Sequence, residues 1–148
     1  MKLTKEQQLA IDIRDANVLV SAAAGSGKTS VLTQRIISRI TDTEDPVDVD
    51  RLLVMTFTNA AAEEMRERIR KAIEGSEADP SLIERQSALV HNAMITTIHG
   101  FCKSVIADHF EELSLDPNFR VADDNESKLI MQDALDECME NAYEDRKS

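Results

Sequence analysis

The chain has 148 residues, the length of one ordinary domain or of one domain and the start of another. Hydrophobic residues make up 42% of it, which is enough for a packed core and argues against wholesale disorder. Two cysteines, Cys102 and Cys138, are too few for a disulfide framework, and we expect them to be reduced in a cytoplasmic protein. No apolar run approaches the roughly 20 residues of a membrane span, so we expect no membrane partner.

The net charge of -11 by itself argues against nucleic-acid binding, because proteins that bind phosphates usually carry a basic footprint. The acidity is unevenly spread, however. Residues 1–107 carry 13 basic and 15 acidic side chains, whereas residues 108–148 carry 4 and 13. The first 107 residues are therefore nearly neutral and leave room for a local DNA track.

In chain order, a short first helix is predicted after its N-cap Thr4, with Gln7 completing a capping box. Apolar runs predict buried strands at residues 17–21, 52–57 and 93–98. Helical spacing of apolar residues predicts helices at 28–39, 60–73, 101–113 and 123–143. Polar and Pro- or Gly-containing stretches predict a loop at 42–50 and a turn at 75–81. Strands that alternate with helices predict an α/β fold with a parallel sheet.

The strongest local signal is a phosphate-loop pattern between the first predicted strand and the helix after it. It runs Ala22-Ala23-Ala24-Gly25-Ser26-Gly27-Lys28-Thr29 and departs from the strict pattern only at Ala22, where that pattern has Gly. Small residues let backbone amides surround phosphates at the positive end of a helix. Lys28 offers a charge to the outer phosphates, and the Thr29 hydroxyl is placed to bind magnesium. The alternative is a glycine turn with a surface lysine, which the strand–loop–helix context disfavours.

A phosphate loop alone is compatible with a kinase, a GTPase, a transporter or a helicase, so the flanking residues decide. Residues 3–11 resemble the glutamine motif of superfamily 1 helicases, and in that family the residue aligned with Gln7 reads the adenine edge with its amide. Residues 54–66 look like helicase motif Ia, and residues 96–102 look like the next motif, Thr-x-His-x-Phe.

The resemblance implies a site for ATP and Mg²⁺ and a site for single-stranded DNA. The implied nucleotide-binding residues are Gln7, Ala22, Ala23, Ala24, Gly25, Ser26, Gly27, Lys28, Thr29 and Ser30, of which Lys28 and Thr29 are the catalytic pair and Thr29 the metal ligand. The implied DNA-binding residues are Thr56, Phe57, Thr58, Asn59, Thr97, His99 and Phe101. Without the resemblance, Phe57 would be assigned to the core, and Thr58 and Gln7 to helix capping. Four basic residues of the same region are predicted to pair with neighbouring acids on one helix rather than to bind DNA: Arg66, Arg68, Arg70 and Lys71.

Residues 58–65 and 97–102 are similar to the helicase–nuclease branch of the superfamily, meaning the RecB and AddA families, and residues 115–123 are similar to AddA. This resemblance implies an incomplete RecA-like parallel sheet of a P-loop NTPase in residues 1–113. It places the start of an inserted helical subdomain in residues 114–148. It also implies an ATP-driven motor that acts on DNA single strands and duplex ends in break repair, together with an AddB-like second subunit.

The pair Asp136-Glu137 resembles the carboxylates that helicases use for magnesium and water, but apolar residues around it repeat at helical spacing. We therefore expect an amphipathic helix there. We expect the chain to be the front piece of a longer helicase, not catalytic by itself, and able to self-associate through unpaired sheet edges and its last helix. Three alternatives stay open: a UvrD- or Rep-like helicase, another phosphate-loop NTPase such as a kinase or GTPase, and a non-catalytic interaction module.

Overall fold

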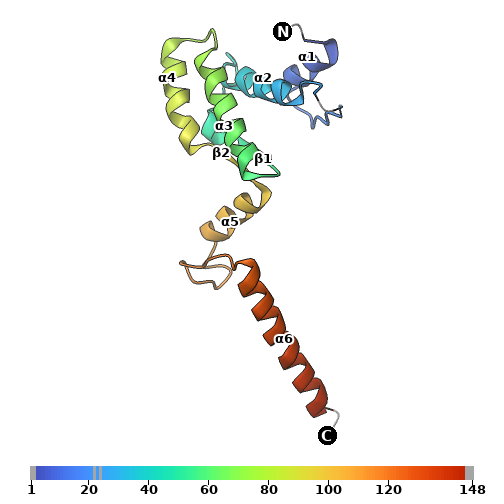
Figure 1. Cartoon of the computed structure of the whole chain (residues 1–148). Helices are drawn as coiled ribbons and strands as arrows, with labels where there is room; N and C mark the ends of the chain where they lie inside the picture. The colour runs from blue at the N-terminus through green and yellow to red at the C-terminus, as the bar shows by residue number, and fades with distance from the viewer. Residues whose placement is uncertain (1–2, 22, 24, 146–148) are drawn as a thin grey trace. The chain divides into compact units, whose positions relative to one another are not determined.

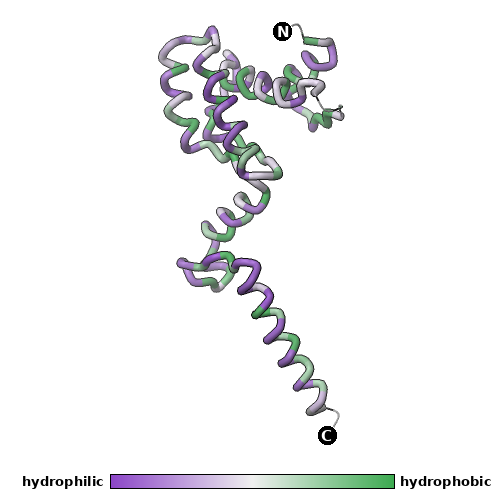
Figure 2. The backbone as a smooth tube through the Cα atoms, viewed as in Figure 1, coloured by the Kyte–Doolittle hydropathy of each residue, from purple (hydrophilic) through white to green (hydrophobic). Residues whose placement is uncertain are grey.

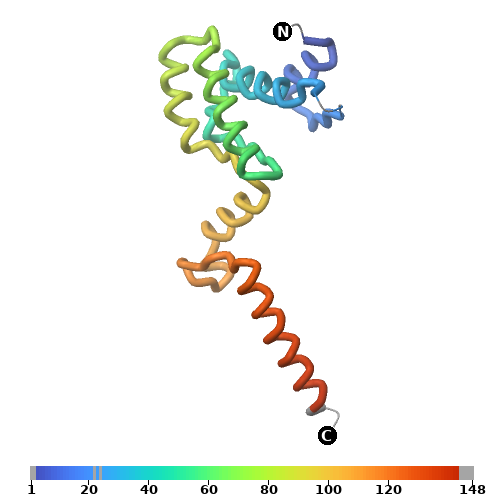
Figure 3. The backbone as a smooth tube through the Cα atoms, in the orientation of Figure 1, coloured from blue at the N-terminus to red at the C-terminus, as the bar shows by residue number. Residues whose placement is uncertain are grey.

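The computed structural model describes residues 3–21, 23 and 25–145. The chain divides into two compact units, one up to Val105 and one from Ile106 onward, and each is described by itself. Figures 1 and 3 trace the backbone of both units. Within the described ranges, no helix combines the length and the apolar character that a membrane crossing requires.

The first unit contains a parallel pair of strands, β1 (Leu53–Thr56) and β2 (Met94–Thr97), in which Val54 is the partner of Ile95. Apolar runs at residues 52–57 and 93–98 predicted both strands, and both are confirmed. Parallel strands need a long crossover connection. Here the crossover contains two α-helices. Because the strands are parallel, their C-terminal ends, which lead to the predicted DNA-contacting residues, lie at the same end of the sheet.

The crossover consists of α3 (Asn59–Glu74), α4 (Pro80–Leu89) and the short 3-10 helix η2 (Val90–Asn92). Figure 1 shows α3 and α4 side by side, in agreement with their contacts. The sequence predicted α3 but missed α4. Its signal was present, because Asp79 accepts a hydrogen bond from the Ser81 amide as the N-cap and proline occupies the first helical position.

The core lies between α3, the covered face of the sheet and α2 (Lys28–Ile40). Ile69 in the middle of α3 is fully buried. Val54 of β1 and Ile95 of β2 are the strand side chains that are buried in the same cluster. Ile36 and Ile40 bring the C-terminal half of α2 into the same cluster. The phosphate-loop helix and the crossover helix therefore share one core.

The second face of the sheet stays open within the described part of the chain. Leu53 and Met55 are 44% and 49% exposed, and Met94 is 37% exposed. Parallel strands usually have both faces covered. In the described residues the two strands are covered on one side only, the face that carries Val54 and Ile95.

The prediction of a strand at residues 17–21 is wrong, because no strand forms there. This segment runs as irregular chain, and its apolar side chains are exposed, with Leu19 at 95%. A strand forms only where another strand pairs with its backbone, and in the described ranges β1 and β2 pair only with each other. The apolar run was correctly located, but apolar character alone did not supply a hydrogen-bonding neighbour.

The segment before β1 is anchored by a buried amide. The Gln86 side chain is 1% exposed; its Oε1 accepts from the Val49 amide at 3.0 Å, and its Nε2 donates to Asp48 Oδ1 at 2.6 Å. Val49 opens the 3-10 helix η1 (Val49–Arg51) inside the stretch that was predicted as loop only. Both polar ends of a buried side chain are thus satisfied, as burial requires.

Basic residues on α3 pair with acids as predicted, with one exception. Arg70 donates to Glu67 and Glu74, and Arg68 donates to Glu64. Hydrogen bonds from Arg70 and then from Lys71 lower the pKa of Glu67 to about 2. The exception is Arg66, which has an ion contact to Glu63 but also turns inward to backbone carbonyls.

The second unit is dominated by α6 (Asp124–Asp145), which confirms the predicted last helix. Figure 2 shows apolar and polar residues interspersed along it. The Asp136-Glu137 pair lies inside this helix, as expected. The apolar stripe is exposed within the unit, with Leu129 at 63% and Leu135 at 61%.

We predict that Ile69→Ala lowers the free energy of unfolding by about 2–5 kcal/mol, because it leaves a cavity at the centre of the shared core. Urea unfolding followed by circular dichroism measures the change. Glu64→Ala on the exposed side of the same helix serves as the control and should cost about 0.5 kcal/mol or less. Equal stability of the two variants would contradict the central position of Ile69.

Candidate functional site

The phosphate-loop sequence folds into a tight turn that leads directly into α2. Gly25 and Gly27 have φ values of 77° and 86°, a region that glycine enters without steric cost. Gly27 is the N-cap residue of α2, so the helix begins at Lys28. Two predicted nucleotide-binding residues, Ala22 and Ala24, lie outside the described residues. The described part of the loop has the loop-to-helix geometry that anion binding at a helix N-terminus requires.

The Lys28 side chain lies across the mouth of the loop, where its Nζ donates to the Ala23 carbonyl at 2.7 Å. Thr29 is exposed in the first turn of α2, and Ser30 is half-buried with its hydroxyl accepting from Gln34 Nε2 at 3.3 Å. An ammonium and a hydroxyl therefore border the same turn of backbone amides. This arrangement can bind a phosphate group and offers one protein ligand to a magnesium ion.

Gln7 joins the first helix to this loop. The helix α1 (Lys5–Asp12) starts with the predicted capping box, in which the Thr4 amide donates to Gln7 Oε1 at 2.9 Å. The Gln7 Nε2 donates to the Ser26 carbonyl at 3.1 Å. A carboxamide has two acceptor lone pairs and two N–H groups. One of each therefore remains on Gln7 for a ligand, so capping and base recognition are compatible.

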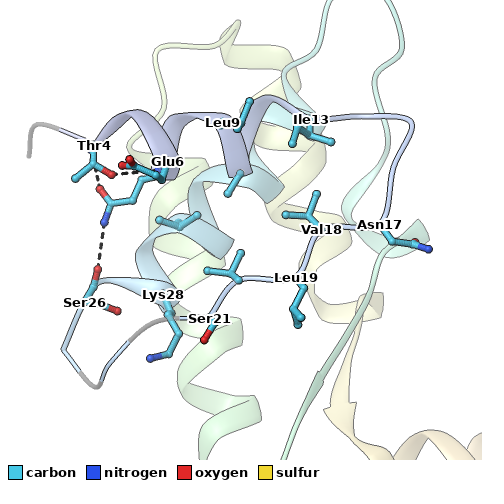
Figure 4. Close-up of a pocket in the computed structure, with 14 residues that line it drawn as sticks. Thr4, Glu6, Leu9, Ile13, Asn17, Val18, Leu19, Ser21, Ser26 and Lys28 are labelled. Carbon is cyan, nitrogen blue, oxygen red and sulfur yellow. Dashed lines mark hydrogen bonds between the residues drawn. The ribbon is translucent and has the colours of Figure 1, made fainter.

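A cavity of about 640 Å³ opens between α1, the 17–21 segment and the phosphate loop. Figure 4 shows Leu9 and Ile13 on the α1 side and Ser26 and Lys28 at the loop end. Val18, Leu19 and Val20 line the opposite side. Apolar side chains line most of the cavity, and the loop end adds the polar groups of Ser26 and Lys28, a combination that suits a flat base with a charged phosphate tail.

Another cavity, of about 300 Å³, lies between the N-terminus of α2 and the loop after β1. Thr29 borders it together with Thr56, Phe57, Glu64 and Arg68. The structure thus brings the predicted metal ligand and the predicted DNA-stacking residue to one cavity, although they are far apart in the sequence.

The loop after β1 carries the first group of predicted DNA-binding residues. The Phe57 ring is 95% exposed. Thr58 is the N-cap of α3 and accepts from the Ala61 amide at 3.1 Å, and the Thr56 hydroxyl donates to the Thr58 carbonyl at 3.0 Å. Asn59, the first residue of α3, is exposed. An exposed ring held on a rigid, capped turn is a suitable platform for a stacked base.

The second group follows β2, where α5 (Ile98–Asp108) begins. His99 is exposed and Phe101 half-buried, but Thr97 is only 8% exposed and its Oγ1 accepts from the Gly100 amide at 3.1 Å. Thr97 therefore holds the turn. Among the described residues, no three His, Cys, Asp or Glu side chains cluster as a metal site.

Arg66 is a residue whose position the sequence did not predict. Its guanidinium donates to the carbonyls of Val90, Ala93 and Ile95 at 3.1, 3.2 and 2.9 Å. It thereby ties α3, which follows the Phe57 loop, to the start of β2, which precedes the His99 loop. The local charge pattern could not reveal this contact, because the carbonyl partners lie 24 to 29 residues away.

Comparison with known proteins identifies one family. The family described as the UvrD/REP helicase N-terminal domain matches residues 3–148. The chain is 56% identical over 145 residues to a Clostridium perfringens strain 13 protein and 56% identical over 146 residues to an Acetivibrio thermocellus protein. A Clostridioides difficile strain 630 protein is 51% identical over 149 residues. The names of all three describe one subunit of an ATP-dependent helicase/nuclease. These alignments cover 96–98% of the chain, and the chain spans 11–12% of the length of the curated relatives it matches.

We predict that Gly100→Ala destabilises the protein by about 1–3 kcal/mol, the usual cost of forcing an extra methyl into a packed site. A Cβ at this position would lie 2.3 Å from Thr96 Oγ1 and 3.3 Å from Thr97 Oγ1. Thermal unfolding measures the loss. The double variant Gly100→Ala/Thr96→Ala removes the nearest atom and should recover part of the stability, and no recovery would place the strain elsewhere.

Proposed function

The chain belongs to the UvrD/REP helicase family, and on that basis we propose that it is the ATP-binding and DNA-contacting front of the first motor domain of an ATP-dependent helicase–nuclease. The observation that carries the proposal is the phosphate loop, with its two positive-φ glycines, Lys28 at its mouth and an apolar cavity beside it. The names of the relatives support the helicase–nuclease branch over a UvrD- or Rep-like helicase. No separate feature of the site favours a kinase, a GTPase or a purely structural module.

In this proposal the triphosphate of ATP lies against the loop from Ala23 to Ser30, with its charge facing Lys28. The loop amides and the α2 N-terminus supply donors and positive potential. Thr29 contributes its hydroxyl to Mg²⁺. The adenine lies in the apolar cavity, where the free lone pair and the free N–H of Gln7 match the base's amine and ring nitrogen. Ala22 and Ala24 complete the loop by sequence.

We further propose that single-stranded DNA passes the two strand ends. Phe57 offers a stacking face, and Asn59 and His99 offer polar groups to the backbone or bases. Thr56 and Thr58 fix the first turn, while Thr97 and half-buried Phe101 fix the second. Arg66 ties α3, which follows the first turn, to the start of β2, which leads to the second. The nearly neutral charge of the first 107 residues is compatible with this local track.

We also propose a role for the longer protein to which such a domain belongs. Residues 1–113 form an incomplete RecA-like sheet with its helices, and residues 114–148 begin a helical subdomain, 1B. The full activity is ATP-driven unwinding and processing of broken duplex ends, with an AddB-like second subunit. Two free, exposed cysteines support a reducing, cytoplasmic setting. The exposed sheet face and α6 stripe support self-association of this chain.

By itself the chain should bind a nucleotide without turning it over. Hydrolysis needs a carboxylate for magnesium and another group to orient water. The Asp136-Glu137 pair lies within α6 and not at a strand end, so we assign it no part in hydrolysis.

We predict that Lys28→Ala weakens Mg-ADP binding by about 1.5–3 kcal/mol, the usual contribution of a hydrogen bond to a charged group. Isothermal calorimetry on the wild type and the variant measures the difference. Lys71→Ala removes an exposed lysine from α3, away from the loop, and should leave the affinity unchanged. Equal affinities for all three proteins would refute the phosphate-loop assignment.

We also predict that Phe57→Ala weakens binding of a short oligothymidine by about 1–3 kcal/mol, since it removes one stacking face. Fluorescence anisotropy at low salt is the suitable measurement, because the net charge of -11 opposes binding. Tyr143→Ala removes another exposed aromatic ring, on the acidic helix α6, and should have no effect. If the Tyr143 variant lost affinity and the Phe57 variant did not, the DNA track would lie in the second unit.

A further inference from the structure

The helix α1 is too short to hold its own position. It has 8 residues, and isolated helices of that length are marginal in water. Its last turn contains no basic residue to balance the exposed carbonyls of the C-terminus. Only Ala10 and Ile11 are buried, in a small cluster with Val31 of α2. Its placement must therefore come largely from polar contacts with its neighbours.

Two guanidinium groups from outside α1 bind its C-terminal carbonyls. Arg35 Nη1 donates to the Ala10 carbonyl at 2.6 Å and to the Ile11 carbonyl at 3.3 Å. Arg14 Nη1 donates to the Ile11 carbonyl at 2.7 Å and to the Asp12 carbonyl at 3.2 Å. Arg14 also reaches Ser38 of α2 through its Nη2 at 2.7 Å. Both arginines thus connect the end of α1 to the phosphate-loop helix.

Arg35 lies on α2, the same helix that begins with Lys28 of the phosphate loop. It follows Lys28 by seven residues, or about two helical turns, so the phosphate loop and the Arg35 contact belong to one rigid element. At the other end of α1, Gln7 Nε2 binds the Ser26 carbonyl of the loop itself. The helix α1 is therefore fixed at both ends to the unit of loop and α2. Its middle, including Leu9 and Ala10, forms one wall of the cavity beside the loop.

We propose that Arg35, assisted by Arg14, is a positioning residue for base selection: it holds α1, and with it the Gln7 amide, at the distance from the phosphate loop at which the cavity accepts adenine in preference to guanine. Arg35 itself lies outside the lining of the cavity, so it acts through α1. This inference rests on the proposed nucleotide site. Phosphate binding depends on the loop and Lys28, whereas base selection depends on α1. Loss of Arg35 should separate the two.

The test compares three ligands, Mg-ADP, Mg-GDP and magnesium pyrophosphate, by calorimetry on the wild type, Arg35→Met and Arg39→Met. Methionine keeps the apolar stem and removes the donors. We expect Arg35→Met to weaken ADP about tenfold, equivalent to about 1.4 kcal/mol, and to bring the ADP and GDP affinities together. Its affinity for pyrophosphate should stay within about twofold, because the loop and Lys28 are untouched. Arg39→Met is the matched control one turn further along α2, where Arg39 has an ion contact to Asp45 and should not affect selection.

Each result decides the inference. An unchanged preference for ADP over GDP in Arg35→Met would overturn it, and so would an equal loss of ADP and pyrophosphate, which would indicate general damage to the fold. If Arg35→Met does not fold by circular dichroism, Arg35→Lys keeps one charged donor for the Ala10 carbonyl. That variant should show a reduced ADP preference with normal pyrophosphate binding, and an unchanged preference would overturn the inference. Failure of the wild type to bind either ADP or pyrophosphate would instead refute the proposed nucleotide site.

Discussion

The packing of α3 on one face of the parallel strand pair is the constraint on which the rest of the first unit depends. Ile69 is fully buried there, and the same cluster contains the C-terminal half of α2. Because α3 begins directly after β1, its position fixes the direction of the Phe57 loop. Because α2 begins at the phosphate loop, its position fixes the loop relative to that sheet edge. One apolar cluster therefore sets the geometry of both candidate sites.

Polar contacts complete what the core leaves undetermined. Arg66 joins α3 to the start of β2 through three carbonyls, and Gln7 joins α1 to the phosphate loop. In each case a side chain binds backbone groups of a distant segment. Such contacts depend on the fold that surrounds them and add directional precision that apolar packing lacks, because hydrophobic attraction has no preferred direction.

Local patterns in the sequence predicted most of this fold. The phosphate loop, the capping box at Thr4, both paired strands and the last helix follow from residue types at fixed spacing. The strand at 17–21 failed, because pairing depends on a neighbour that local sequence does not specify. Likewise, α4 was missed although Asp79 marks its start, and the inward turn of Arg66 was invisible because its carbonyl partners lie far along the chain. The motifs located the candidate site residues, but only the folded chain assigns Thr97 to holding a turn.

The buried amide of Gln86 has a consequence for how this sequence can vary. Its oxygen must accept from the Val49 amide while its nitrogen donates to Asp48. A single base change that replaces glutamine by another amino acid gives glutamate, lysine, leucine, proline, arginine or histidine, and the first five supply at most one of these two neutral functions. Most of these substitutions therefore leave a buried polar group without a partner, which costs about 1–3 kcal/mol of stability. If this position proved invariant among relatives, the demand of the fold on a buried amide would be a sufficient explanation, and the invariance would not by itself indicate a role in catalysis.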